Sequence, residues 1–200
     1  SIVILVRGSG MPDRDLQGHS TTACYVCGSG DIRPYRHVHG FSVLQCRICG
    51  LLWVVCPDEE RIRAYYDEHY FNNDSKMGYR NYLEDEDNQR LNARHILSIS
   101  NRFAHLANAK VLDIGSAFGF FLDEARRSLA CDVYGVEVSA YARAYAMGSL
   151  GLTHISQDVQ MRDWGPGFFD AVFLVGTIEH LASPRETLCH VSRVLKQGGV

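Results

Sequence analysis

The stretch VLDIGSAFG, residues Val111 to Gly119, decides the fold class of this 200-residue chain. It begins as a short apolar strand, breaks at glycines and is followed by an amphipathic helix. A second apolar run, residues 132–138, is predicted to be a strand and carries Glu137 near its end. A carboxylate at that place is positioned to accept two hydrogen bonds from the hydroxyls of a ribose. The pattern therefore predicts a Rossmann-like unit that binds a nucleotide cofactor.

The spacing of the glycines distinguishes between the cofactors that such a unit holds. A dinucleotide fingerprint, G-x-G-x-x-G, requires its third glycine at position 120, where this chain has Phe120. The observed order is Asp113-x-Gly115-x-Ala117-x-Gly119. This order resembles the first motif of class I S-adenosylmethionine-dependent methyltransferases, with Ala117 where that family usually has its middle glycine. Because alanine disfavours a positive φ, we expect the loop to differ slightly in shape.

The elements after this loop alternate between strand and helix, which implies a parallel sheet. Residues 140–147 form a predicted helix, residues 153–156 and 169–175 are predicted strands, and a final helix begins at Pro184. In methyltransferases of this class, the stretch 169–200 has a close likeness. We therefore predict an α/β fold with a Rossmann-like parallel sheet of about four strands. Since the family's sheet has seven strands and this chain ends just after a pair of glycines, we expect the sheet to be incomplete and the domain truncated at its C-terminus.

The resemblance spans most of residues 108–200 and implies a role for each residue that matches a family motif. A carboxylate pairs well with vicinal hydroxyls or an exocyclic amine, and glycines bring backbone N–H groups near a ligand. Glu137 would otherwise be a solvated strand end, and Asp158 would otherwise only cap a turn. The implied S-adenosylmethionine site has three parts: the methionine end at Asp113, Gly115, Ser116, Ala117, Phe118 and Gly119, the ribose at Glu137, and the adenine at Asp158 and Val159.

Three polar residues follow the predicted strand 169–175, at the edge where a parallel sheet opens its ligand crevice. They are Thr177, Glu179 and His180. A histidine has a pKa suited to taking a proton from a hydroxyl, or from a carbon beside a carbonyl. His180 is therefore the predicted general base for methyl transfer, while the alternative is that Glu179 and His180 only shape the loop or orient the cofactor.

Two C-x-x-C-G sequences, CYVCG and CRICG, are the second strong feature of the chain. Two such turns deliver four thiolates, from Cys24, Cys27, Cys46 and Cys49, to one tetrahedral Zn²⁺. Disulfides are the main alternative, but no secretory signal accompanies the cysteines and their number, seven, is odd. Redox chemistry needs only one such pair, and iron in place of zinc stays open. Because four thiolates leave no open position for water, the metal is expected to have a structural role.

The histidines between the two turns, His37 and His39, are expected to be surface residues of a strand, because four thiolates already complete the metal site. The stretch CxxCG…CxxCGLLW…YYDEHYF resembles the N-terminal zinc-binding segment found ahead of some class I methyltransferases. Several of those are similar to sugar C-methyltransferases, which act on nucleotide-linked keto-sugars. The resemblance implies that the methyl acceptor is a small molecule.

The segment between these two regions carries two further patterns. The apolar residues Ile96, Ile99, Phe103 and Leu106 predict one face of a helix. Tyr82, with Tyr79 before it, either packs in the core or lies near the sulfonium of the cofactor and gains cation–π attraction. We predict four segments in all: a disordered N-terminus at 1–19, a zinc-ribbon-like module at 20–57, a helical linker that covers the cofactor site at 58–107, and the partial methyltransferase domain at 108–200.

Two other functions compete with methyl transfer. One is a zinc-knuckle binding module beside a degenerate Rossmann-like domain, and the other is a nicotinamide-dependent oxidoreductase. A nucleic-acid partner is disfavoured by the formal net charge of −3 and by the lack of a dense Lys/Arg cluster. With 46% hydrophobic residues, 22% charged residues and no apolar run near the length of a membrane span, the composition predicts a cytoplasmic enzyme.

Overall fold

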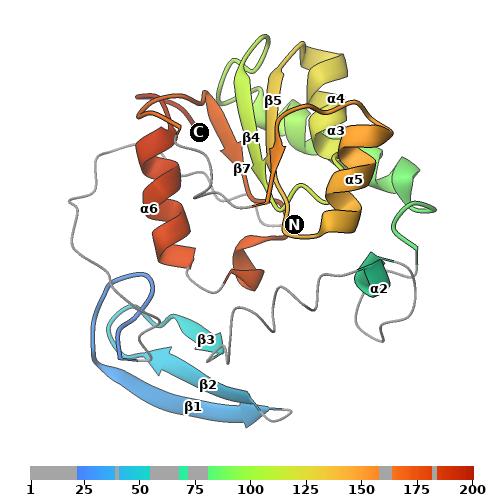
Figure 1. The fold of residues 1–200 in the computed structure, drawn as a ribbon. Coiled ribbons are helices and arrows are strands. Elements are labelled where there is room, and N and C mark those ends of the chain that lie inside the picture. The colour runs from blue at the N-terminus through green and yellow to red at the C-terminus, as the bar shows by residue number, and fades with distance from the viewer. Residues whose placement is uncertain (1–21, 39–40, 55–67, 72–80, 158–163, 182–183) are drawn as a thin grey trace.

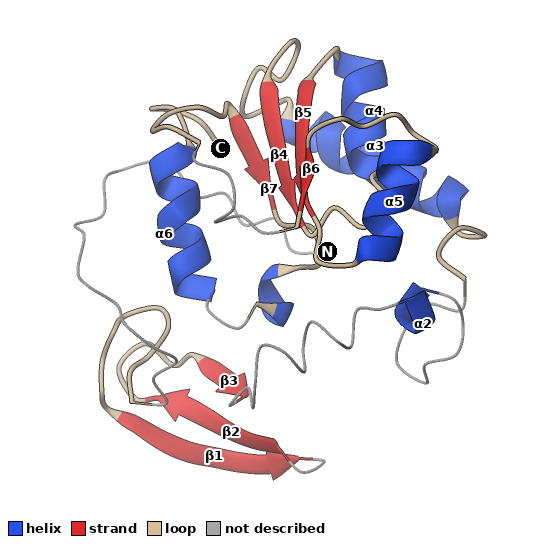
Figure 2. Ribbon diagram, viewed as in Figure 1, coloured by secondary structure: helices blue, strands red, loops and turns tan. Residues whose placement is uncertain are grey.

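The computed structural model describes six stretches of the chain: residues 22–38, 41–54, 68–71, 81–157, 164–181 and 184–200. Two β-sheets organise these residues (Figure 2). A three-stranded antiparallel sheet lies nearer the N-terminus of the chain, and a four-stranded parallel sheet belongs to its C-terminal half. In Figure 1 the first sheet is coloured blue to cyan and the second green to red.

The parallel sheet carries the strand order β6-β5-β4-β7, so consecutive strands are joined by crossover connections. A helix over Phe120–Leu129 joins β4 to β5, and a helix over Ala140–Gly148 joins β5 to β6, in keeping with the crossovers that parallel pairing requires. The prediction of an α/β fold with a Rossmann-like sheet of about four strands is confirmed. The four strands are β4 (Lys110–Ile114), β5 (Asp132–Val136), β6 (Ile155–Ser156) and β7 (Ala171–Phe173).

Three of these strands are shorter than the sequence predicts, and one of them, β6, begins at Ile155 rather than at 153. β5 ends at Val136 rather than at 138, and β7 ends at Phe173 rather than at 175. Both strands pair with β4, and their last partners there are Ile114 and Asp113. Because β4 turns into the glycine loop directly after Ile114, it offers β5 no further residue to pair with, and the pairing with β7 stops one residue earlier.

Helices pack on both faces of the parallel sheet (Figure 1). Side chains of β4 alternate between the two faces: Val111 is buried in the core formed with α3 and α4, and Leu112 in the core formed with α6. No helix in the described stretches has the length and apolar character that crossing a membrane requires. The helices are α2 (Glu68–Phe71), α3 (Glu86–Ser100), α4 (Phe120–Leu129), α5 (Ala140–Gly148) and α6 (Pro184–Val194), and a short 3-10 turn, η2 (Ile178–His180), follows β7.

The predicted apolar face over residues 96–106 is only partly correct. Ile96 is buried, as expected, but α3 ends at Ser100 and Phe103 is 60% exposed. The Asn101 side chain accepts a hydrogen bond from the N–H of Leu106 at 2.9 Å. This bond closes a turn that brings Leu106 back into the core from outside the helix, while the side chain of Phe103 is left in solvent.

A network of charged residues joins α3 to α4. The Asp123 carboxylate, whose side chain is fully buried, contacts Arg90 at 2.9 Å, Arg126 at 2.6 Å and Arg127 at 3.1 Å. Burial alone would raise the pKa of this carboxyl, but the three guanidinium groups outweigh it and hold the pKa below its ordinary value. Asp123 is therefore a charged anchor between the two helices.

Replacing Asp123 with Asn is expected to lower the free energy of unfolding by about 2 kcal/mol at pH 7, because charge-assisted hydrogen bonds are lost. The pKa of Asp123 is lower in the folded protein than in the unfolded chain. The difference in the free energy of unfolding between the wild type and Asp123→Asn is therefore complete above the ordinary pKa of about 3.9. It shrinks as the pH falls through the pKa of the folded state. Urea unfolding at several pH values measures this, with the exposed Asp87→Asn as control. A difference that stays constant down to the acid limit would contradict the assignment.

The antiparallel sheet has the strand order β1-β2-β3. Its small core contains Cys24, Cys46 and Trp53. One contact to the parallel-sheet unit involves Arg185, at the start of α6, which donates a hydrogen bond to the Val26 carbonyl at 3.4 Å. His37 is exposed on its strand, as predicted, whereas His39 lies outside the described residues. The strands are β1 (Ile32–Val38), β2 (Phe41–Cys46) and β3 (Leu52–Val54).

Candidate functional site

The glycine loop, residues 115–119, joins β4 to α4 and has an irregular backbone. Gly115 and Gly119 have φ values of 81° and 83°, and Ala117 has a φ of 46°. Ala117 thus adopts the left-handed conformation that alanine disfavours. The N–H of Ala117 donates to Glu137 Oε2 at 2.8 Å. A hydrogen bond from β5 thus holds the alanine in a conformation that it disfavours.

Replacing Ala117 with Gly is expected to raise the free energy of unfolding by about 0.5–1 kcal/mol. The variant relieves the cost of a left-handed alanine, about 1–2 kcal/mol, and loses part of this gain to the greater freedom of glycine in the unfolded chain. The matched control is Ala144→Gly, on the exposed face of α5, which should destabilise the protein by about 1 kcal/mol. Chemical denaturation of both variants tests this, and equal destabilisation would contradict the left-handed conformation.

Glu137 follows β5 directly and is 6% exposed. Its second carboxylate oxygen, Oε1, accepts the N–H of Ser139 at 2.8 Å. Burial raises the pKa of the Glu137 carboxyl, against the N–H groups of Ser139 and Ala117, which lower it. This carboxylate is a fixed, buried group and not a solvated strand end, and each oxygen keeps acceptor capacity for a further donor.

Asp113 lies on the neighbouring strand, opposite Gly135 of β5. It is 3% exposed, and within the described residues its Oδ1 atom has no hydrogen-bond partner. Burial, followed by the negative charge of Glu137, raises the pKa of the Asp113 carboxyl well above its ordinary value. Such an orphaned buried oxygen is costly, and it marks a place where a donor or cation is missing.

Most N–H groups of the glycine loop are bonded to acceptors within the protein. Those of Gly115 and Ser116 donate to the Val136 carbonyl at 2.7 and 3.0 Å, and that of Gly119 donates to the Ser116 carbonyl at 2.8 Å. With the N–H of Ala117 bonded to Glu137, four of the five loop N–H groups are satisfied inside the protein. The loop therefore offers a ligand mainly its shape and its oxygen atoms.

Phe118, at the centre of the loop, is fully buried in a cluster of aromatic side chains. Tyr82 stacks on it with ring centroids 5.1 Å apart, and Phe71 of α2 meets it edge-on at 5.0 Å. Tyr82 packs against this cluster, which is one of the two roles predicted for it, while Tyr79 lies outside the described residues. Residues that precede the parallel sheet thus cover the outer side of the glycine loop.

The segment that follows β7 reaches the same loop. Thr177, which precedes η2, lies so close to Gly115 that a Cβ atom at that glycine would collide with its side chain. His180, the predicted base, ends η2 and is exposed, as is Glu179. The structure therefore brings the post-β7 turn and the glycine loop together. Asp158 and Val159, predicted to bind adenine, lie outside the described residues.

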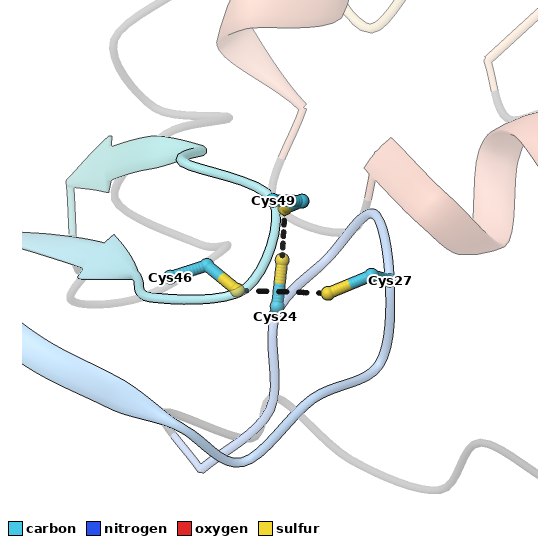
Figure 3. Close-up of side chains that lie close together, drawn as sticks. All are labelled: Cys24, Cys27, Cys46 and Cys49. Atoms are coloured by element: carbon cyan, nitrogen blue, oxygen red, sulfur yellow. Dashed lines mark hydrogen bonds between the residues drawn. The ribbon is translucent and has the colours of Figure 1, made fainter.

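The four cysteines of the C-x-x-C pairs converge on one point (Figure 3). Their sulfur atoms all lie within 4.8 Å of one another. The closest pairs are Cys24 with Cys49 and Cys27 with Cys46, each with sulfurs 3.5 Å apart. Thiolates around a tetrahedral zinc, with Zn–S bonds of about 2.3 Å, would be about 3.8 Å apart. The separations exceed the disulfide bond length of about 2.05 Å, and all four thiols are free.

Backbone turns prepare these thiols for a metal. In each C-x-x-C-G turn, the glycine N–H donates to the carbonyl of the first cysteine, and Gly28 and Gly50 have φ values of 71° and 78°. The N–H groups of Cys49 and Ile48 lower the pKa of the Cys46 thiol to about 7, against burial, which raises it. The donor set is four soft sulfur ligands without an open position, which suits a structural Zn²⁺.

Comparison with known proteins agrees with the geometry of the parallel-sheet unit. A family model described as "Methyltransferase domain" matches residues 112–200. A sterol 24-C-methyltransferase of Candida albicans is 25% identical over 162 residues, which are 72% of this chain and 43% of that protein. A ubiquinone biosynthesis O-methyltransferase of Thiobacillus denitrificans is 32% identical over 102 residues, 48% of this chain and 44% of that protein. The chain thus spans less than half the length of the curated relatives it matches.

Several solved structures are similar to part of this chain. An S-adenosylmethionine-dependent methyltransferase from Archaeoglobus fulgidus is 21% identical, with a TM-score of 0.46 over 57% of this chain and 53% of that one. The YcgJ protein of Bacillus subtilis is 23% identical, with a TM-score of 0.45 over 53% of this chain and 48% of that one. The family match to the glycine loop and the strands after it is the finding that assigns this region. Over residues 112–200 the chain is therefore similar to the methyltransferase domain family.

Proposed function

We propose that this protein transfers a methyl group from S-adenosylmethionine to a small organic molecule. The observation that carries the proposal is the buried Glu137 carboxylate, held by backbone N–H groups from the glycine loop and from the start of α5 within the matched domain. A carboxylate fixed in this way, beside a glycine loop at the carboxyl end of a parallel strand, suits the two hydroxyls of a ribose.

The residues of the site fit the other parts of the donor as well. We assign the methionine end to Asp113 and to the loop from Gly115 to Gly119. The orphaned Oδ1 atom of Asp113 would accept from the ammonium group of the methionine end, which would remove the cost of burying that oxygen unpaired. Asp158 and Val159 keep their proposed role beside the adenine.

The chemistry that S-adenosylmethionine supplies when bound is a methyl group on a positively charged sulfur. The protein's part is to align the acceptor with that group and to remove a proton from the acceptor. His180 is our candidate base, because it lies in the turn that follows β7, and Thr177 of the same segment contacts the glycine loop. The imidazole would take the acceptor's proton as the methyl carbon bonds to the acceptor and its bond to the sulfur breaks, which would leave S-adenosylhomocysteine.

For the acceptor we propose a nucleotide-linked sugar or another biosynthetic intermediate. The names of the relatives, which refer to sterol and to ubiquinone biosynthesis, support a small molecule as acceptor. A cytoplasmic location and the four segments at 1–19, 20–57, 58–107 and 108–200 remain predictions.

We also propose that the four cysteines bind one structural Zn²⁺. The three-stranded sheet has a core of only a few buried side chains, so it depends on a further source of stability. Zinc would contribute on the order of 10 kcal/mol to this local fold.

The donor is tested by calorimetric titration of S-adenosylhomocysteine and NAD⁺ into the protein. Selective micromolar binding of S-adenosylhomocysteine is the expected result. Preferential binding of NAD⁺ would favour a nicotinamide-dependent oxidoreductase. If neither ligand bound to folded protein, a zinc-knuckle binding module with a degenerate Rossmann-like domain would become the better explanation.

A further inference from the structure

Arg143 is a residue of α5 whose side chain contacts the main chain at Glu137. It belongs to the early part of α5, which Ser139 precedes as N-cap. Its guanidinium Nη1 donates to two carbonyl oxygens outside the helix, those of Glu137 at 2.6 Å and Val138 at 2.7 Å. The side chain therefore bonds the backbone of the residue whose carboxylate we assign to the ribose.

A positive charge near the start of a helix opposes the helix dipole, which favours anions there. The first turn of α5 contains no acidic residue that would offset this charge. The compensation for Arg143 comes from the two carbonyl bonds and from the Glu137 carboxylate, which its charge stabilises. The charge of Arg143 is therefore unfavourable beside the dipole of α5, and it stabilises the ionised form of Glu137.

The two bonds of Arg143 hold the main chain at Glu137 and at the next residue, and not the Glu137 carboxylate. The carboxylate is fixed by the N–H groups of Ala117 and Ser139, while the main chain that carries it is fixed by the Arg143 guanidinium. We propose that Arg143 is a positioning residue that holds Glu137 in the geometry and charge state needed to bind the ribose of the donor. This inference rests on the proposed role of Glu137.

The charges around Glu137 give Arg143 a second, measurable effect. Asp113 faces it from β4 and Arg143 from α5, and the guanidinium lowers the pKa of the Glu137 carboxyl, which burial raises. Without the guanidinium, that pKa rises further, so the ionised form that accepts from hydroxyls is lost at a higher pH. As the pH is lowered, a variant without this charge should therefore lose affinity for the donor more than the wild type does.

The experiment measures the Kd of S-adenosylhomocysteine by calorimetry at pH 6 and pH 8 for the wild type, Arg143→Met, Arg143→Lys, Glu137→Gln and the double variant Glu137→Gln with Arg143→Met. Arg143→Met should weaken binding about five- to tenfold at pH 8, and more at pH 6. Arg143→Lys keeps the charge, so its affinity should depend on pH nearly as that of the wild type does. This variant keeps the test valid if Arg143→Met folds poorly. In the Glu137→Gln background, Arg143→Met should change Kd by no more than about twofold. Arg102→Met, at an exposed arginine after α3, serves as control and should bind like the wild type.

Each outcome bears on one proposal. An Arg143→Met variant that binds like the wild type at both pH values overturns the positioning role and leaves the donor assignment standing. An equal loss in the wild-type and Glu137→Gln backgrounds overturns it too, because the effect would then not pass through the carboxylate. A folded wild type that binds no S-adenosylhomocysteine overturns the proposed function and, with it, the role of Arg143.

Discussion

Replacing Glu137 with Ala is expected to weaken the binding of S-adenosylhomocysteine by about tenfold or more, and this is the largest effect that a single substitution should have on the donor site. The estimate follows from the loss of charge-assisted hydrogen bonds worth about 1.5–3 kcal/mol. The structure adds a second cost, since the N–H groups of Ala117 and Ser139 lose their acceptor. The variant should therefore also be less stable than the wild type.

Two comparisons separate these effects. Glu137→Gln keeps one oxygen acceptor, so it should retain more stability than Glu137→Ala while still losing most of the affinity. The 2′-deoxy analogue of S-adenosylhomocysteine removes one hydroxyl, so the wild type should prefer the parent ligand and both variants should not. Asp132→Asn, at an exposed carboxylate that begins the same strand, should leave affinity unchanged. If Glu137→Ala bound the ligand as tightly as the wild type, the ribose assignment would be wrong.

The order of the elements in the parallel-sheet unit was predictable from the sequence, because it depends on local signals. An apolar run that breaks at glycines predicts β4 and its loop, and a proline at a helix start marks α6. The strand ends were not predictable, because they depend on where pairing with β4 stops, at Ile114 for β5 and one residue earlier for β7. Phe103 was misassigned for a similar reason, since one side-chain bond from Asn101 ends the helical path.

In the candidate site, too, residues with a local sequence signal were predictable, whereas contacts between distant segments were not. Glu137 was identified from its place at the end of a strand, and the four cysteines from their spacing. The bonding of the loop N–H groups was not foreseeable, because the acceptor of Ala117 lies 20 residues further along the chain. Arg143 gave no signal either, because its contact with Glu137 depends on how α5 turns back over the end of β5. Ser139 caps α5, with its side chain accepting from the N–H of Ala142, and a serine before a helix is a recognisable signal of this role.

Replacing Cys46 with Ser is expected to release the metal and to unfold the three-stranded sheet. Cys46 is fully buried, and its thiol is the one whose pKa the backbone lowers most clearly toward neutrality. A serine hydroxyl does not ionise in this range and is a poor zinc ligand, so a stoichiometric zinc content near one should fall toward zero. Metal analysis gives the stoichiometry, and hydrogen exchange over β1 to β3 measures the local unfolding.

The same substitution also tests how independent the two sheets are. The metal cluster lies beside the antiparallel sheet, whereas Glu137 follows β5 of the parallel sheet, so S-adenosylhomocysteine should still bind, within about threefold of the wild-type Kd. Cys189→Ser, at an exposed free cysteine of α6, is the matched control and should keep its zinc. Retained stoichiometric zinc in Cys46→Ser would contradict the four-thiolate site. Complete loss of ligand binding would instead indicate that contacts such as that of Arg185 with Val26 make the parallel-sheet unit depend on the metal.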